Sequence, residues 1–139
     1  MSVLLGLMLA ATGAAVDVTP KDPAEAIALA DAHPERSTRG VYRMTVAAAE
    51  RNPKALYLNS STDYRAPDDM TFRLTSSAAR TLEKRLGAKP EVALIGRTVT
   101  VRGDIRAVPI VNTFGGRPRS FNRYQHSVLV HDASQLSVE

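Results

Sequence analysis

The clearest pattern along the chain is an alternation of apolar and polar residues that recurs in short segments after residue 39. Alternation with a period of two is typical of a β-strand that buries one face and exposes the other. The pattern predicts five strands, at residues 40–46, 55–58, 70–75, 98–106 and 127–131. The run at 98–106 is the most regular, and one further alternating pair, Leu136 and Val138, closes the chain.

A helix is predicted between the third and fourth strands. Apolar residues recur at helical spacing from Ala78 to Leu86, and Gly87 stands where a helix C-terminal glycine belongs. Ser76 or Ser77 is the expected N-cap, because a serine hydroxyl accepts hydrogen bonds from the free N–H groups of the first turn. The segment between Pro90 and Gly96 follows as a connector.

A second, shorter helix is expected ahead of the strands. Asp22 has the form of an N-cap, Pro23 occupies the first helical position, and Pro34 ends anything helical soon afterwards. We interpret residues 16–39 as a linker that contains this helix and leads into the main domain.

Glycine and proline mark the irregular parts of the predicted strands. Gly103, inside the fourth strand, indicates a barrel corner or a bulge where the strand bends sharply. The segment from Pro109 to Asn122 contains prolines, glycines and arginines, so it is predicted to be a long exposed loop before the fifth strand.

The order of elements is three antiparallel strands, one helix and two further strands. In a chain of this size, this order is the topology of the OB-fold, a five-stranded, partly open Greek-key barrel. The sequence therefore predicts an all-β fold with one helix. An open sheet with one helix packed across it would satisfy the same pattern.

Three stretches resemble known OB-fold domains. The run Gly96–Ile105 resembles their fourth strand, and Val128–Leu136 resembles their closing strand. The residues at 58–65 and 67–71 are similar to a segment of small exported bacterial proteins of this fold. The resemblance covers residues 40–139 and implies a binding module, since this scaffold binds single strands, oligosaccharides, proteins and small ligands. The insertion at 111–124 departs from the usual short final connection.

The first residues of the chain have the pattern of a leader. Residues 3–16 carry no charge and end in the small residues Gly13, Ala14 and Ala15, which resembles a secretory signal peptide. We therefore expect a signal peptide at 1–15 and export to the periplasm or the exterior. A buried N-terminal helix is the alternative, and the run is too short for a transmembrane span, which needs about 20 apolar residues.

Composition narrows the possible chemistry. The 139 residues include no cysteine, which excludes disulfides, thiol nucleophiles and cysteine-ligated zinc. Eighteen basic side chains against 14 acidic ones leave a formal net charge of +4, which favours anionic partners without selecting one. We expect a monomer without a cofactor.

No group of residues predicts catalysis or metal binding. The histidines His33, His126 and His131 have no carboxylate at a recognised ligand spacing. The aspartates Asp63, Asp68 and Asp69 gather in one loop, where turn hydrogen bonds are the ordinary role of aspartate. A phosphodiesterase built on this loop is a minor alternative.

The strongest functional signal is a segment in which arginines alternate with aromatic residues, namely Phe114, Arg117, Arg119, Phe121, Arg123 and Tyr124. Arginines can pair with phosphates while rings stack on bases. Arg43, Arg73 and the strand aromatic Tyr57 could extend this surface. The opposing interpretation is that the rings pack the loop onto the barrel and the arginines keep it solvated.

These observations predict a non-enzymatic module for an anionic ligand, with single-stranded nucleic acid as the named candidate. The alternative is an exported protein that contacts an envelope protein or glycan, or that takes part in a stress response.

Overall fold

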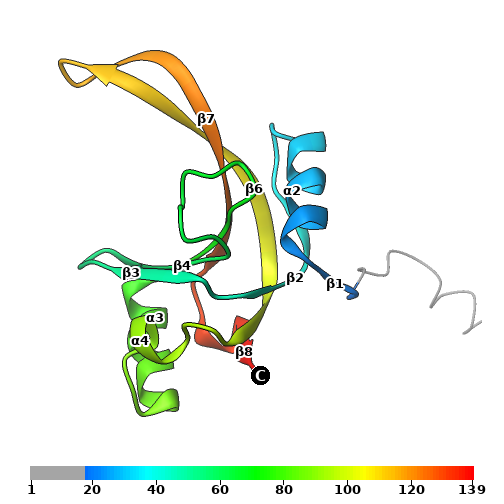
Figure 1. Ribbon diagram of the computed structural model, residues 1–139, viewed down its shortest axis with the longest axis vertical. Coiled ribbons are helices and arrows are strands. Elements are labelled where there is room, and N and C mark those ends of the chain that lie inside the picture. Colours follow the sequence, from blue (N-terminus) through cyan, green and yellow to red (C-terminus); the bar gives the residue numbers. More distant parts are fainter. Residues whose placement is uncertain (1–17) are drawn as a thin grey trace, which may run out of the picture.

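The computed structural model describes residues 18–139, so the expected signal peptide at 1–15 lies outside the described residues. Within them, the chain forms one curled eight-stranded sheet and three α-helices (Figure 1). The prediction of a mostly β fold is confirmed at this level. The number of elements is larger than the predicted five strands and one helix, because a further short strand follows the first predicted strand and short strands occur at both ends.

The elements follow one another along the chain as a strand and a helix, a block of four strands, two helices, a long hairpin and a short closing segment. In order they are β1 (Pro20–Lys21), α2 (Pro23–Ala32), β2 (Thr38–Thr45), β3 (Ala48–Arg51), β4 (Ala55–Asn59), β5 (Met70–Thr75), α3 (Ser76–Leu86), α4 (Pro90–Ala93), β6 (Thr98–Phe114), β7 (Arg117–Val130), the 3-10 turn η1 (Ala133–Gln135) and β8 (Leu136–Val138).

The sheet curls because β2 and β3, which follow each other closely in the chain, pair with different strands. β2 pairs with β6, and β3 pairs with β4. The strand order is β1-β2-β6-β7-β5-β4-β3, and β8 also pairs with β6. Only Val46 and Ala47 separate β2 from β3. Val46 donates its N–H to the Arg97 carbonyl, and Ala47 donates to the Asn59 carbonyl, at 2.9 and 2.8 Å. These two residues therefore connect β2, near one end of the strand order, to β3 at the other end.

The interior is filled by alternate residues of the strands, as the period of two predicts. On β2, Tyr42 and Met44 are buried while Arg43 and Thr45 are exposed. The Tyr42 hydroxyl donates to the Thr38 carbonyl at 2.6 Å, and burial raises the pKa of Tyr42 to about 12. The other large buried side chains include Leu56, Leu58, Met70, Phe72, Leu74, Leu82, Leu94, Val99, Val101 and Ile105.

Helix α2 begins where the sequence predicts. Asp22 and Glu25 form a capping box, in which each side chain accepts from the other residue's N–H. Ala26 and Ala30 are fully buried in the core cluster, so this face of the helix packs against the sheet. The segment expected as a linker thus contributes buried surface to the domain.

Helix α3 differs from the prediction at its N-cap only. Thr75 caps the helix, with its hydroxyl accepting from the Ala78 N–H at 3.2 Å, where Ser76 or Ser77 was expected. Gly87 closes the helix with φ +68°, a conformation that glycine adopts at little cost. The expected connector after it contains the short helix α4.

The largest correction concerns the predicted loop at 109–122, which is a β-hairpin arm. β6 pairs with β7 as far as Phe114 and Arg117, and the turn between them is Gly115-Gly116 with φ of +59° and +77°. Positive φ at both central residues is the requirement of the favoured two-residue hairpin turn. Pro109 and Pro118 are tolerated because beyond residue 107 the described ribbon has no third strand, so neither proline must donate to one.

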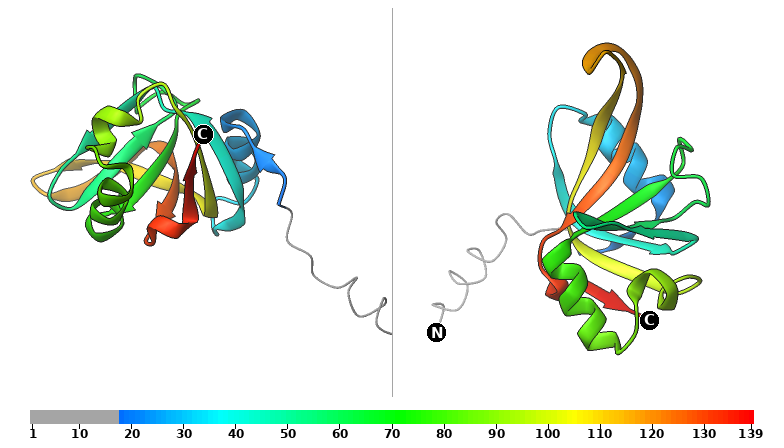
Figure 2. Two further views of the ribbon diagram at one scale, coloured as in Figure 1. Left: turned by 90° about the horizontal axis from the view of Figure 1, so that it is seen from below. Right: turned by 90° about the vertical axis from the view of Figure 1, so that its left-hand side faces the viewer.

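The arm projects well beyond the rest of the molecule (Figures 1 and 2). Two register shifts, at Ile110/Val111 and Asn112/Thr113, are bulges that increase the twist of the ribbon. None of the helices in the described residues is long and apolar enough to cross a bilayer.

Gly103 was predicted to mark a barrel corner or a bulge. It lies in a part of the β2–β6 ladder without a register shift, opposite Gly40, so the bulge is wrong. A Cβ at Gly103 would lie 3.1 Å from Val128 Cγ1 and 3.2 Å from Gln135 Nε2. Glycine is required there because β7 and η1 approach the backbone closely.

We expect Gly103→Val to lower the free energy of unfolding by about 1–3 kcal/mol, the usual cost of overfilling a packed site. Urea unfolding measures this change. Thr100→Val, which introduces the same residue on the same strand without adding a side-chain atom, is the control and should be nearly neutral. Equal stability of Gly103→Val and wild type would mean that the neighbours of Gly103 can move aside.

Candidate ligand-binding groove

A groove of about 470 Å³ lies on the outer face of the sheet, between the arm and the loop at 60–69. Its lining comes from β3, β4, β5, β6, β7 and two adjoining loops, and consists of Glu50, Asn52, Tyr57, Asn59, Tyr64, Thr71, Arg73, Val108, Ile110, Arg123, Gln125 and Ser127. Aromatic, aliphatic, amide and guanidinium groups therefore face one concave surface.

Strand register explains why these residues meet. Tyr57 pairs with Arg73 across β4 and β5, and Asn59 pairs with Thr71 in the same ladder. Neighbouring residues such as Leu58 and Phe72 point the other way and fill the core. The alternation that predicted strands thus also sorts the groove residues onto the outer face.

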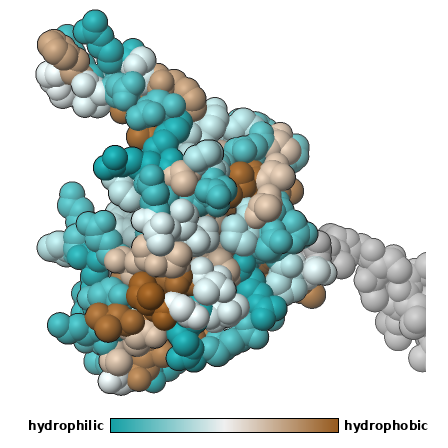
Figure 3. Space-filling model, viewed as in Figure 1, coloured by the Kyte–Doolittle hydropathy of each residue, from teal (hydrophilic) through white to brown (hydrophobic). Residues whose placement is uncertain are grey.

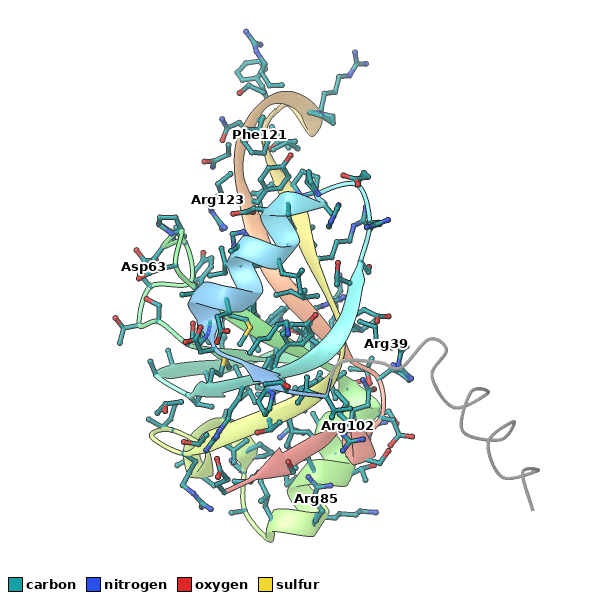
Figure 4. The ribbon with its side chains drawn as sticks, turned by 90° about the vertical axis from the view of Figure 1, so that its right-hand side faces the viewer. Arg39, Asp63, Arg85, Arg102, Phe121 and Arg123 are labelled. Atoms are coloured by element: carbon teal, nitrogen blue, oxygen red, sulfur yellow. The ribbon has the colours of Figure 1, made fainter. Side chains whose placement is uncertain are left out.

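The loop at 60–69 forms one wall of the groove. Tyr64 lies in this loop, and its ring centroid is 5.2 Å from Arg65 Cζ and 5.8 Å from Arg123 Cζ. These distances place both guanidinium groups within cation–π range of the ring. Figure 4 shows Arg123 extending from β7 on the side of the loop that carries Asp63.

Beneath the groove, a polar network joins this loop to the arm. Arg123 Nη1 donates to Gln125 Oε1 at 2.8 Å. Gln125 Nε2 donates to Thr71 Oγ1 at 2.7 Å and to Asp69 Oδ2 at 3.2 Å. Asp69 Oδ1 accepts from the Ser61 N–H at 2.9 Å. The network ends at a carboxyl group that is fully buried.

Burial raises the pKa of the Asp69 carboxyl, although hydrogen bonds from Thr71, Ser61 and Gln125 act in the opposite direction. The Thr71 hydroxyl lies 2.8 Å from Asp69 Oδ2 and 2.7 Å from Asn59 Oδ1, yet it has one hydrogen to give. A proton on Asp69 resolves this conflict, because Asp69 then donates to Thr71 while Thr71 donates to Asn59.

The face that forms the groove continues along the arm. Val108, Ile110, Asn112 and Phe114 alternate along β6 and so share this face. Asn112 Nδ2 donates to Ser120 Oγ at 3.0 Å, and Arg119 Cζ lies 5.4 Å from the Phe114 ring centroid. Phe114 is 73% exposed, so its ring is open to solvent at the tip.

The opposite face of the arm is apolar. Tyr124 pairs with Pro109, and Phe121 pairs with Val111, so these side chains alternate with the groove residues. The rings of Phe121 and Tyr124 contact each other with centroids 4.9 Å apart.

The structure brings together part of the predicted site. Tyr57, Arg73 and Arg123 line the groove. Phe114 and Arg119 lie on the same face at the arm tip, with Arg117 paired to Phe114 across the turn. Phe121 and Tyr124 are on the apolar side.

Arg43 is separate from the other predicted residues. It lines another hollow of about 400 Å³ beside Asp22 and Glu25. Its guanidinium forms an ion pair with Glu139 at 2.5 Å. It is therefore not placed to extend the groove.

Positive charge is concentrated on the arm. The segment 108–124 contains three arginines and no acidic residue, whereas the net charge of the whole chain is +4. Within residues 18–139, the ion pairs of arginine involve Arg39, Arg43 and Arg51 and none on the arm. In Figure 3 the base of the arm is hydrophilic, and hydrophobic surface gathers on the lower part of the molecule, where α4 lies.

The histidines have local roles. His126 Nε2 lies 2.7 Å from Asp31 Oδ1, which joins β7 to α2. His33 lies 3.8 Å from Glu35, and His131 is exposed after the end of β7. Among the described residues, no three histidine or acidic side chains form a group that could hold a metal ion.

Sequence reasoning missed the apolar and amide part of the groove, in particular Asn59, Tyr64, Val108, Ile110 and Gln125. For Val108 and Ile110 the available signal was the alternation that continues the fourth strand toward Gly115-Gly116. The prolines concealed this signal.

The pH dependence of stability tests the state of Asp69. Its folded-state pKa is above the ordinary value of 3.8, so folding favours the protonated form. The resulting contribution to stability is complete below that ordinary pKa and is lost as pH rises through the raised value. Asp69→Asn cannot ionise, so we expect wild type to lose stability relative to this variant as pH rises from below 3.8 to neutrality.

Urea unfolding of both proteins across this range measures the difference. Asp68→Asn, which changes the exposed neighbouring aspartate, is the control and should retain the wild-type loss. A constant difference between wild type and Asp69→Asn at every pH would contradict the raised pKa.

No protein-family model matches this chain, and no curated protein matches it. Among solved structures, it is similar to a crystal structure from Leishmania major Friedlin of a protein described as an aspartyl-tRNA synthetase, with a TM-score of 0.46 and 9% sequence identity. The match covers 98% of this chain and 26% of that one, so this chain spans about a quarter of its length. Both similarity values are too low to bear on function.

Proposed function

We propose that this protein is a non-enzymatic OB-fold module that binds single-stranded nucleic acid in the groove and along the arm. The observation that carries the proposal is one continuous face on which Tyr57, Arg73 and Arg123 lead to Phe114 and Arg119. The charge pattern supports it, because the arm segment 108–124 is basic without any acidic residue.

Strand pairing supports the OB-fold part of the proposal. If β2 and β3 are treated as one bent strand, the five main strands pair in a closed order, with β4, β5, β7 and β6 following in turn. The contact of β5 with β7 is parallel and the others are antiparallel. A five-stranded Greek-key barrel with α3 between its third and fourth strands has this order, and the extra short strands are additions to it.

The chemistry of the groove suits a flexible polyanion with flat bases. Arginines form strong charge-assisted hydrogen bonds with phosphates, and exposed rings stack on bases of any type. A duplex presents its bases already stacked, so the ring of Phe114 and the concave groove with Tyr57 have less to bind there.

The first test is titration of a fluorescein-labelled oligonucleotide followed by anisotropy at several salt concentrations. We expect binding at low salt that weakens as salt rises, because phosphate contacts release bound counterions. The variant Arg117→Ala/Arg119→Ala/Arg123→Ala should bind about a thousandfold more weakly, since each of the three charge-assisted hydrogen bonds contributes on the order of 1.5 kcal/mol. Its salt dependence should be shallower, by roughly 0.7 in log–log slope for each phosphate that the variant no longer neutralises.

The matched control is Arg80→Ala/Lys84→Ala/Arg102→Ala, which removes the same charge away from the arm. Its affinity should remain close to wild type. Undetectable binding of wild type at low salt, or binding that is insensitive to salt, would contradict the proposal. Equal reductions of affinity in the two triple variants would remove the arm from the site.

The second test concerns stacking at Tyr57. Tyr57→Ala should weaken oligonucleotide binding by about 1–3 kcal/mol, the usual value for one stacked base, whereas Tyr57→Phe should retain it. Anisotropy measures both affinities, and thermal unfolding verifies that the variants fold. A reduction in Tyr57→Phe equal to that in Tyr57→Ala would show that the hydroxyl, rather than the ring face, matters.

If the protein is exported, an anionic envelope glycan or a protein partner becomes a better candidate ligand than nucleic acid. The same titration separates these cases when dextran sulfate is added as a competitor. If a labelled anionic polysaccharide binds and oligonucleotides do not, the groove serves the alternative ligand.

A further inference from the structure

We propose that Asp69 is a positioning residue that acts from beneath the groove and, through Gln125, fixes the guanidinium of Arg123 in the orientation that meets the ligand. The inference rests on the proposed function for the identity of the ligand. It assigns a role to an aspartate that is fully buried and is not itself part of the groove lining.

The direction of the hydrogen bonds carries the argument. Gln125 Nε2 lies 2.7 Å from Thr71 Oγ1 and 3.2 Å from Asp69 Oδ2, so both amide hydrogens have acceptors on the buried side. An amide has its oxygen opposite its nitrogen. Gln125 Oε1 must therefore face outward, where it accepts from Arg123 Nη1 at 2.8 Å.

Arg123 is thereby held by two separate elements. Gln125 holds one terminal nitrogen, and the Tyr64 ring from the loop at 60–69 lies 5.8 Å from Cζ. A guanidinium has five N–H donors, and this arrangement uses one of them. The others are available to phosphate oxygens without the entropy cost of first ordering a free arginine.

Replacing Asp69 by asparagine would reverse the direction of the hydrogen bonds that run from Asp69 through Gln125 to Arg123. Either oxygen of a carboxyl group can accept a hydrogen bond, whether or not the group is protonated, but an amide nitrogen cannot. In Asp69→Asn, Oδ1 must continue to accept from the Ser61 N–H, so the new nitrogen faces Gln125. Gln125 then gains by turning its oxygen inward, which leaves its NH₂ group against Arg123, donor against donor.

The expected effect has the opposite sign to that of charge alone. Removing a carboxylate near an anion site should strengthen binding, and Asp68→Asn, which removes the neighbouring exposed carboxylate, should leave affinity unchanged or slightly higher. Asp69→Asn should weaken oligonucleotide binding by about tenfold, because the substitution removes one hydrogen bond to a charged group.

A double-mutant cycle separates positioning from a general structural effect. In the Arg123→Ala background, Asp69→Asn should not weaken binding any further, because the group that it positions is gone. Gln125→Met removes the acceptor for Arg123, while the buried carboxyl keeps its hydrogen bonds to Ser61 and Thr71. It should reproduce the weakening of about tenfold even if Asp69→Asn fails to fold.

The free protein provides a readout that does not depend on the ligand. In ¹⁵N-edited NMR spectra, Asp69→Asn and Gln125→Met should both shift the Arg123 Nε–H signal toward that of solvated arginines, while Asp68→Asn should not. An unchanged signal, or a reduction of affinity that persists in the Arg123→Ala background, would overturn the inference. If wild type binds no oligonucleotide, the proposed function fails, and the NMR result alone decides whether Asp69 positions Arg123.

Discussion

The pairing of β6 with β7 is the interaction on which the rest of the structure depends. Its first part lies in the barrel-like sheet, where Ile105 faces the core with Val128 opposite it, and its second part continues to Phe114 and Arg117 without a third strand. The same ladder therefore holds the core together, forms part of the groove floor and directs the arm. Cross-strand hydrogen bonds and the Gly115-Gly116 turn are sufficient for the distal part because its first part is anchored in a wide sheet.

This construction affects binding because it orders the arginines before any ligand arrives. A long loop with the same residues would have to give up backbone freedom on binding, at about 1–2 kcal/mol for each residue fixed. In a paired ribbon, this backbone entropy has already been lost when the protein folds. The register also decides which side chains act together, since Arg123 and Phe121 are two residues apart but a bulge places them on opposite faces.

The sequence predicts those parts of the fold in which local pattern and tertiary structure agree. Alternation locates β2, β4 and β5, and capping chemistry locates α2, because Asp22 and Pro23 determine its start whatever packs against it. The hairpin arm was not predicted, since Pro109 and Pro118 are breakers in a central strand and harmless in a two-stranded ribbon. Of the residues that line the groove, the aromatic Tyr57 and the two arginines Arg73 and Arg123 could be recognised from the sequence by their residue type. Asn59 and Gln125 could not, because their roles depend on a strand register that local pattern does not contain.

The position of Asp69 shows how a carboxyl group can belong to a site for anions. An ionised carboxylate on the groove surface would repel phosphates. Asp69 is instead buried below Thr71 and Gln125, and burial raises the pKa of its carboxyl, which favours the neutral form. Its oxygens act as acceptors that draw the donors of the overlying side chains downward. The side-chain oxygen of Gln125 then faces outward, where it can accept a hydrogen bond from Arg123. A buried acid and a half-buried guanidinium are therefore compatible, because the side-chain amide of Gln125 lies between them and sets the orientation of Arg123.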